Sequence, residues 1–311
     1  MQRTRSETAL FDAATDTSTA GGARGRVSVV ISSYNHAPYI ESAIRSVLDQ
    51  TYTDVELIVV DDGSADQSVE IISRLAGQSA FEFRAQSNKG LTRTLNEAFS
   101  RCSGEYLVPF GSDDIMLPNR LAVQAEYMRD KPDVGMCCGN IELIDADGNL
   151  YDPTDEGTSA PFQRLSFDDL FINRKSGLAA PTMMIRREAF ERAGGFNPEI
   201  HLEDLYIQLK ILSLGYYIDK LPVLMARYRK HPTNSYKNIR FMTESILRIY
   251  QDYADHPAYD RVRLKFINSM LSKASRKDKK LARELLSQLP LSSWNARTLK
   301  SLVRLAMPAR D

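Results

Sequence analysis

Apolar runs of strand length alternate with amphipathic stretches in the first third of the chain. Runs rich in β-branched or aromatic residues lie at 27–32, 55–60, 81–83 and 106–110, and the first three are each followed by apolar residues three or four positions apart. The runs predict strands, and the spaced positions predict helices with one buried face. Repeated alternation of this kind predicts an α/β fold with a Rossmann-like, mainly parallel sheet flanked by helices.

The alternation becomes less regular after the fourth expected strand. Apolar residues at helical spacing predict a helix over 117–128 and a second helix that begins at Glu203. Apolar runs predict strands over 134–144, 181–187 and 216–228. Residues 145–150 carry the first acids of an EF-hand loop, but no Glu closes the series, so a β-turn or hairpin is expected. Residues 151–177 are polar and poorly periodic, which is typical of a lid.

The two ends of the chain differ from this α/β segment. Residues 1–25 are rich in Thr, Ser, Ala and Gly without a continuous apolar core, so we expect a disordered tail rather than a signal peptide or a membrane span. From residue 239 onward, apolar positions recur at helical spacing with no strand between them. The expected division is a tail over 1–25, an α/β domain over 26–235 and a C-terminal helical region over 236–311.

Composition narrows the function only in part. The chain of 311 residues has 40 basic and 40 acidic side chains, so no net field points to a partner, and no nucleic-acid partner is expected. Its 3 cysteines offer no disulfide framework or zinc spacing, which favours a reducing compartment. The charge is uneven, however, because residues 261–311 hold thirteen Lys or Arg and three Asp or Glu by count of the sequence.

Candidate functional residues lie where the expected strands end. Asp113 and Asp114 follow the fourth apolar run, and paired carboxylates of this kind suit Mg²⁺ or Mn²⁺, which complete their shells with water and substrate phosphates. Ser32 and Asp62 end the first and second runs. Parallel sheets bind ligands beyond the carboxyl ends of their strands, so these residues are expected to share a crevice. Taken alone, an Asp-rich turn also explains the acidic pair.

Two common phosphate-binding motifs are missing. The turn after the first strand reads Ser-Ser-Tyr-Asn-His at residues 32–36, without the glycines of a dinucleotide-binding loop, which counts against an NAD-dependent oxidoreductase. No Gly-Lys-Ser or Gly-Lys-Thr of a P-loop occurs either. A bound phosphate would therefore need a metal ion or basic side chains to balance its charge.

Six short motifs together carry a family resemblance. They are Val-Ser-Val-Val-Ile-Ser-Ser-Tyr-Asn at 27–35, Ser-Val-Leu-Asp-Gln-Thr-Tyr at 46–52, Glu-Leu-Ile-Val-Val-Asp-Asp-Gly-Ser at 56–64, Asn-Lys-Gly at 88–90, Ser-Asp-Asp at 112–114 and Glu-Asp at 203–204. In this order they resemble an inverting family 2 glycosyltransferase of the GT-A fold, of the bacterial surface-polysaccharide type. The resemblance covers residues 27–235.

The resemblance implies roles for the matching residues. Ser32 and Asp62 would contact the nucleotide base, with Tyr34 beside them, and Asp113 would contact the ribose. Ser112 stands at the first position of the family's Asp-x-Asp motif, and Asp114 at its last, the metal-binding one. The residues expected to face the diphosphate are Asn88, Lys89 and Arg93, at a helix N-terminus. A plain loop and helix cap would account for Asn88–Gly90 as well.

Further roles follow for residues late in the chain. Asp204 matches the catalytic base, which removes the proton of the acceptor hydroxyl, and Glu203 orients or replaces it. His231 would close over the metal ion or the diphosphate. The helix macrodipole alone accounts for two acids in a first helical turn, and a lone His is often structural.

The expected function is metal-dependent transfer, with Mn²⁺ or Mg²⁺, of a sugar from a UDP or dTDP donor to a hydroxyl of a glycan or lipid-linked acceptor. The alternative is a non-catalytic nucleotide-sugar-binding partner in a polysaccharide assembly complex. The expected location is cytoplasmic, with the basic C-terminal helices touching the anionic inner face of the bacterial inner membrane. A homo-oligomer is left open.

Overall fold

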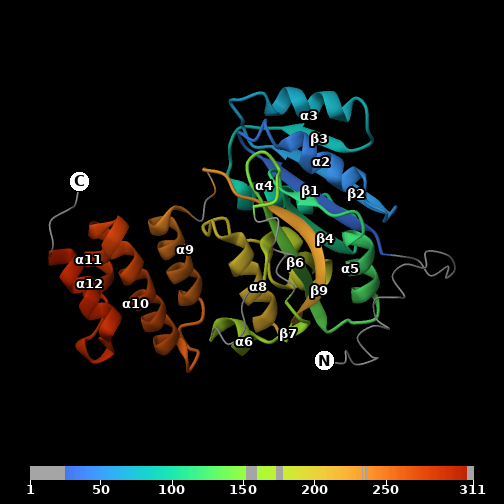
Figure 1. Ribbon diagram of the computed structural model, residues 1–311. Helices are drawn as coiled ribbons and strands as arrows, with labels where there is room; N and C mark the ends of the chain where they lie inside the picture. The colour runs from blue at the N-terminus through green and yellow to red at the C-terminus, as the bar shows by residue number, and fades with distance from the viewer. Residues whose placement is uncertain (1–24, 152–159, 173–177, 233, 235–236, 307–311) are drawn as a thin grey trace, which may run out of the picture.

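The computed structural model describes residues 25–151, 160–172, 178–232, 234 and 237–306. One twisted sheet forms the middle of the α/β part and has helices on both faces, while the C-terminal helices form a separate block beside it (Figure 1). The expected tail lies outside the described residues, apart from Gly25.

The N-terminal half of the sheet is parallel. Its strands run in the order β3-β2-β1-β4, and the helices between them are α2 (Ile40–Leu48), α3 (Ser68–Ala76) and α4 (Leu91–Phe99). The strands are β1 (Val27–Ser33), β2 (Val55–Asp61), β3 (Glu82–Ala85) and β4 (Tyr106–Gly111). Ser33 lies beside Asp61, and Ser32 lies beside Gly111. The carboxyl ends of β1, β2 and β4 therefore meet at one edge, as expected for this fold.

The other half of the sheet is mixed. β6 pairs in parallel with β9, whereas β8 joins both β4 and β6 in antiparallel fashion, and β5 and β7 pair antiparallel with β9. These strands are β5 (Ile115–Met116), β6 (Val134–Ile144), β7 (Gln163–Leu165), β8 (Met184–Arg186) and β9 (Tyr217–Arg229). The prediction of an α/β sheet flanked by helices is confirmed, and the antiparallel pairs are an addition to it.

Alternate residues of β1 face two different apolar cores. Val29 and Ile31 pack with α2, α3 and α5 (Arg120–Arg129), whereas Val30 packs with α4, α7 (Arg187–Arg192) and α8 (Glu203–Ser213). Side chains alternate across a strand, so a strand buried on both faces needs a continuous apolar run. That requirement explains the unbroken apolar run of residues 29–31 in the middle of β1.

The C-terminal region is helical, as expected. Its helices are α9 (Ile239–Gln251), α10 (Tyr259–Lys277), α11 (Lys279–Ser287) and α12 (Ala296–Ala306). α10, α11 and α12 share one apolar cluster, and the start of α10 joins α9 in a second cluster with α8 and α6 (Phe167–Phe171). Among the described helices, none has the length and apolar character needed to cross a bilayer.

Two loop predictions have different outcomes. The Asp145 carboxylate accepts hydrogen bonds from the backbone N–H groups of Asp147 and Asn149, and Ile144 bridges to Leu150 in antiparallel fashion, so the expected hairpin turn is confirmed. The expected lid lies partly outside the described residues, at 152–159 and 173–177. Between those gaps, β7 and α6 form elements that the polar composition did not predict.

Candidate active site

The Asp62 carboxylate organises the loop that precedes α4. Asp62 is almost fully buried, and its Oδ1 accepts hydrogen bonds from the Lys89 backbone N–H and from Gln86 Nε2, each at 2.9 Å. Its Oδ2 accepts from the Gly90 N–H at 2.8 Å. These donors occupy three of about four lone-pair positions on the carboxylate. Asp62 therefore shapes the Asn88–Gly90 loop, and one acceptor position remains for a ligand donor.

The turns after β1 and β2 are tied to each other. Asn35 adopts a left-handed backbone with φ of 53°, which Asn tolerates better than most residues. Its N–H donates to Ser64 Oγ at 2.8 Å, and its Oδ1 accepts from the Ala65 N–H at 2.8 Å. Beside this link, Ser32 is half-buried and the Tyr34 side chain is 50% exposed, so both can be reached by a ligand.

The expected cations lie at the N-terminal end of α4. Lys89 and Arg93 are exposed, and Lys89 Nζ pairs with Glu97 at 2.7 Å. Exposed pairs of this kind contribute little to stability, so an arriving diphosphate can compete for the lysine. That Lys89 and Arg93 bind a diphosphate stays a prediction.

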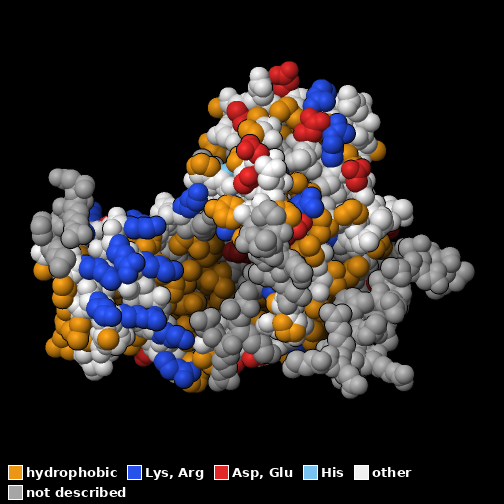
Figure 2. All heavy atoms as spheres, viewed as in Figure 1, with side chains coloured by type: hydrophobic (Ala, Val, Ile, Leu, Met, Phe, Trp, Pro, Cys, Tyr) orange, Lys and Arg blue, Asp and Glu red, His pale blue; other side chains and the backbone are white. Residues whose placement is uncertain are grey.

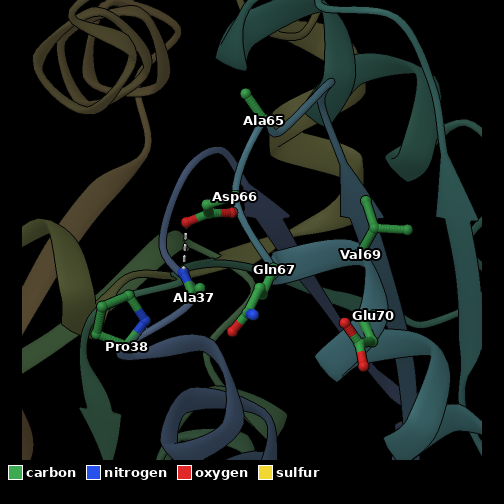
Figure 3. Close-up of a pocket in the computed structure, with 7 residues that line it drawn as sticks. All are labelled: Ala37, Pro38, Ala65, Asp66, Gln67, Val69 and Glu70. Atoms are coloured by element: carbon green, nitrogen blue, oxygen red, sulfur yellow. Dashed lines mark hydrogen bonds between the residues drawn. The ribbon is translucent and has the colours of Figure 1, made fainter.

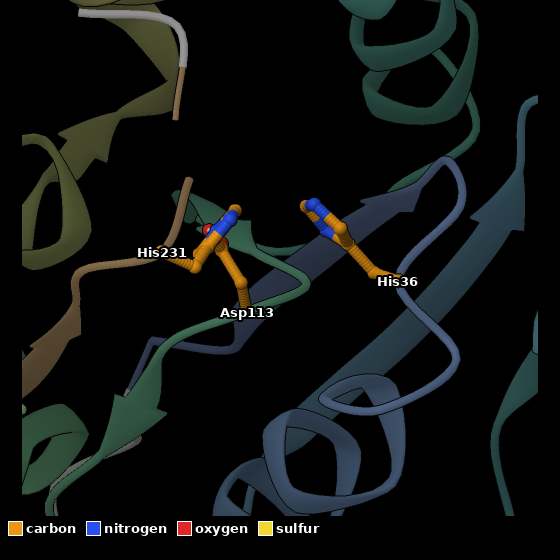
Figure 4. A group of neighbouring side chains, drawn as sticks. All are labelled: His36, Asp113 and His231. Carbon is orange, nitrogen blue, oxygen red and sulfur yellow. The ribbon is translucent and has the colours of Figure 1, made fainter. Parts of the chain in front are cut away.

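Three side chains from separate loops form a candidate metal site. His36 follows β1, Asp113 follows β4 and His231 follows β9, and one ligand atom of each lies within 4.8 Å of the others (Figure 4). His231 Nε2 and Asp113 Oδ2 are 2.8 Å apart. Two ligands at right angles on one cation, each at about 2.1 Å, would lie about 3 Å apart, so this spacing suits shared coordination.

The chemistry of this donor set also suits a divalent ion. Burial lowers the pKa of His36, so the ring is neutral at neutral pH, which is the form that binds a metal. Its Nδ1 lies 2.7 Å from Ser112 Oγ, a contact that orients the ring. Two imidazoles with one carboxylate suit Mn²⁺ better than Mg²⁺, because Mg²⁺ prefers an all-oxygen shell.

The adjacent Asp114 is buried and hydrogen-bonded to the backbone of β9, unlike Asp113. It is 4% exposed, and its Oδ1 accepts a hydrogen bond from the Arg229 backbone N–H at 2.9 Å. Burial, with the nearby charge of Asp113, raises the pKa of Asp114 well above its ordinary value. The structure therefore brings His231 into the three-residue group, together with Asp113 and without Asp114.

Glu203 and Asp204 begin α8, as the sequence predicts. Burial raises the pKa of both carboxyl groups, and the charge of Asp204 raises that of Glu203 further. The Asp204 Oδ1 accepts a hydrogen bond from the Leu205 N–H at 2.7 Å. A base with a raised pKa lies closer to neutral pH, where proton abstraction is most efficient.

Residues that the sequence reasoning missed support this arrangement. His36 lies in the Ser-Ser-Tyr-Asn-His turn after the first strand, and its position at the carboxyl end of that strand is the sequence signal that could have found it. Asn96 on α4 holds the distant turn before α8, because it donates to the Phe196 carbonyl at 2.7 Å and accepts from the Phe196 N–H at 2.9 Å. That pairing has no sequence signal, since the two residues are 100 positions apart.

A cavity lies beside the candidate site but does not contain it. It has a volume of about 690 Å³ and lies between the turns that follow β1 and β2 (Figure 3). Its lining residues are Ala37, Pro38, Ala65, Asp66, Gln67, Val69 and Glu70, none of which is a predicted site residue. The Asp66 carboxylate already accepts hydrogen bonds from the Ala37 N–H and from Ser68.

Residues 28–194 match the model of the family described as "Glycosyl transferase family 2". The chain belongs to glycosyl transferase family 2. The predicted family and enzyme class, glycosyltransferase, are thereby confirmed. Among curated relatives, the "Uncharacterized glycosyltransferase alr2836" of Nostoc is 31% identical over 221 residues, which are 68% of this chain and 66% of that protein. The chain thus spans about two-thirds of the length of this relative.

Other curated relatives have more specific names. An Escherichia coli protein named "UDP-Glc:alpha-D-GlcNAc-diphosphoundecaprenol beta-1,3-glucosyltransferase WfgD" is 29% identical over 187 residues, 60% of this chain and 70% of its own. A Bacillus subtilis protein named "Putative teichuronic acid biosynthesis glycosyltransferase TuaG" is 31% identical over 207 residues, 65% of this chain and 78% of its own.

Solved structures support the fold. Staphylococcus aureus TarS 1–349, crystallised with UDP-GlcNAc, has a TM-score of 0.65 at 17% identity and covers 86% of this chain and 82% of its own. The mannosyltransferase PcManGT from Pyrobaculum calidifontis, in complex with GDP-Man and Mn²⁺, has a TM-score of 0.59 at 19% identity, with coverage of 94% and 88%. The predicted GT-A fold is therefore confirmed.

Proposed function

We propose that this family 2 chain transfers a sugar, with inversion, from a UDP or dTDP donor to a hydroxyl of a glycan or lipid-linked acceptor in polysaccharide biosynthesis. The observation that carries the proposal is the group of His36, Asp113 and His231 at the carboxyl edge of the sheet. The names of the relatives WfgD and TuaG support the biosynthetic setting.

Donor binding is proposed to use the turns around Asp62. The nucleotide base would lie beside Ser32 and Tyr34, and the remaining acceptor position on Asp62 Oδ2 suits the imide N–H that uracil and thymine share. The diphosphate would lie between the three-residue group and the N-terminal end of α4, where Lys89 and Arg93 add positive charge. A divalent cation bound by His36, Asp113 and His231 would stabilise the departing diphosphate.

The acceptor is proposed to react from the side of α8. Asp204 takes the proton of the acceptor hydroxyl as the oxygen attacks the anomeric carbon, and the bond to the diphosphate breaks in the same step. Glu203 is proposed to support this base by position, because burial and the charge of Asp204 raise the pKa of Glu203 and leave Asp204 as the first of the two to ionise. One in-line displacement inverts the anomeric configuration.

A screen of nucleotide sugars tests the proposal. With Mn²⁺, we expect release of UDP or dTDP from one donor, and we expect EDTA to abolish it. Asp204→Asn should lower turnover about 10²-fold or more while donor affinity stays within about threefold, because only proton abstraction is lost. The matched control is Asp168→Asn, which changes an exposed carboxylate on α6. Donor binding without turnover under any condition would instead favour the non-catalytic alternative.

A further inference from the structure

Helix α12 packs Leu305 against the C-terminal cluster, but it also buries two polar side chains and exposes two apolar ones. The side chains it buries include Thr298 and Ser301, at 0% and 1% exposure, while Leu299 and Val303 are 55% and 57% exposed. Thr298 Oγ1 is hydrogen-bonded to the Asn268 side chain of α10, so the polar inner contact is specific. A helix at the surface of a globular protein normally turns its apolar residues inward. The outward apolar stripe therefore indicates a partner outside the chain.

The helical block that carries this stripe also has many exposed cations without an acidic partner among the described residues. The two acids of residues 261–306, Asp278 and Glu284, are both paired with Arg240 of α9. Nine exposed cations on α10, α11 and α12 form no ion pair within the part of the chain that the structure describes. They are Arg261, Lys265, Lys273, Arg276, Lys277, Lys280, Arg283, Arg297 and Lys300. Figure 2 shows Lys and Arg side chains gathered on the visible face of this block, with hydrophobic side chains along its outer edge.

The two features adjoin on α12. At 100° per residue, Arg297, Lys300 and Arg304 share one side of the helix, and the stripe of Leu299 and Val303 lies next to them on the outward side. A helix of eleven residues is about 16 Å long, roughly half the hydrocarbon thickness of a bilayer, so it can lie on a membrane but not cross it.

We propose that α12, with the cations of α10 and α11, docks on the surface of a bilayer that contains anionic phospholipid. Leu299 and Val303 enter the boundary between headgroups and acyl chains, and Arg297 and Lys300 contact lipid phosphates. A second copy of the chain is the other candidate occupant. A two-fold interface through this face would oppose each positive patch with an identical one, so charge disfavours it.

Co-sedimentation of the full chain with vesicles tests the docking surface. We expect binding to vesicles of phosphatidylcholine with phosphatidylglycerol, about tenfold weaker binding to phosphatidylcholine alone, and weakening as salt rises above about 0.15 M. Leu299→Ser with Val303→Ser should reduce binding about tenfold at any salt concentration. Arg297→Gln with Lys300→Gln should reduce binding about tenfold at low salt and flatten its salt dependence.

Phe162→Ser is the matched control, because Phe162 is 48% exposed and lies outside the C-terminal helices. Its vesicle binding should equal that of the unmodified chain, and circular dichroism should show the same helix content for all variants. Two results would overturn the proposal: unchanged vesicle binding by the Leu299 and Val303 variant, or a dimer in sedimentation velocity that this variant abolishes. Because the readout is lipid binding, its failure leaves the proposed transfer activity unaffected.

Discussion

The neighbouring residues Asp113 and Asp114, which follow β4, have different surroundings. Asp113 faces the two imidazoles, whereas Asp114 is buried and holds the backbone of Arg229, two residues before His231. The guanidinium of Arg229 in turn donates to the Asp113 carbonyl at 2.8 Å. We therefore propose that Asp114 positions the segment that carries His231.

This assignment predicts different effects for two matched substitutions. In Asp114→Asn, the amide oxygen can still accept from the Arg229 N–H, so we expect Mn²⁺ affinity within about threefold of the unmodified chain. In Asp113→Asn, a charged ligand is lost, and we expect affinity to fall about 10–100-fold. Titration of Mn²⁺ by electron paramagnetic resonance measures both. The reverse order of effects would support Asp114 as the ligand, as the sequence alone predicted.

At this scale, the sequence pointed to residues that the structure gathers at one edge of the sheet, and their individual roles stay predictions. The acids of 113–114, Asp62 and His231 were all identified, because strand-end acids and a late His are visible in the chain. The different environments of Asp113 and Asp114 were not visible in the sequence, since they depend on a hydrogen bond from Arg229, 115 positions away. His36 was missed because its neighbours in the site come from distant strands.

At the scale of elements, the first turn of α8 places two neighbouring carboxyl groups in a desolvating environment. Burial and the adjacent Asp204 raise the pKa of Glu203 to about 8. The folded state therefore favours the protonated form of Glu203. The resulting stability is fully present below the ordinary carboxyl pKa and is lost as pH rises through the raised value.

Glu203→Gln should remove that loss, because the amide stays neutral. We expect its melting temperature to match the unmodified chain near pH 4 and to exceed it by about 2–4 °C near pH 8, which corresponds to about 1 kcal/mol. Differential scanning fluorimetry across this range measures it. Glu199→Gln, which changes a 75% exposed carboxylate in the preceding loop, is the control and should show no trend. A difference that shrinks as pH rises would contradict the burial of this charge.

Long helices and strands were predicted from the sequence more accurately than short ones. The helix expected after the third strand is found at Leu91–Phe99. Strands β5 and β7 were not expected, because two or three residues carry no periodic signal. The helix expected over 117–128 begins later, at Arg120, because Ile115–Met116 pairs with Arg227 and Ala226 of β9 before the helix starts.

At the scale of the whole molecule, one helix connects the two parts. α10 begins in the cluster it shares with α6 and α8, through Ala258 at its N-cap and Val262, and continues into the cluster it shares with α11 and α12, through Ile267 and Leu271. The division of the chain at residue 236 remains a prediction. The continuity of α10 argues that the two parts unfold together, since melting either end of α10 exposes apolar side chains of the other cluster.

Trp294, the only tryptophan of the chain, provides a local probe of this coupling. It packs against the C-terminal cluster, so its fluorescence reports on α10, α11 and α12, while circular dichroism reports on the whole fold. We expect the two thermal midpoints to agree within about 2 °C and Val262→Ala, at a 7% exposed position, to lower both by about 2–4 °C. Val303→Ala, at a 57% exposed position, is the control and should shift neither. If fluorescence melts well before circular dichroism, and Val262→Ala moves only the fluorescence midpoint, the C-terminal helices are an independent unit.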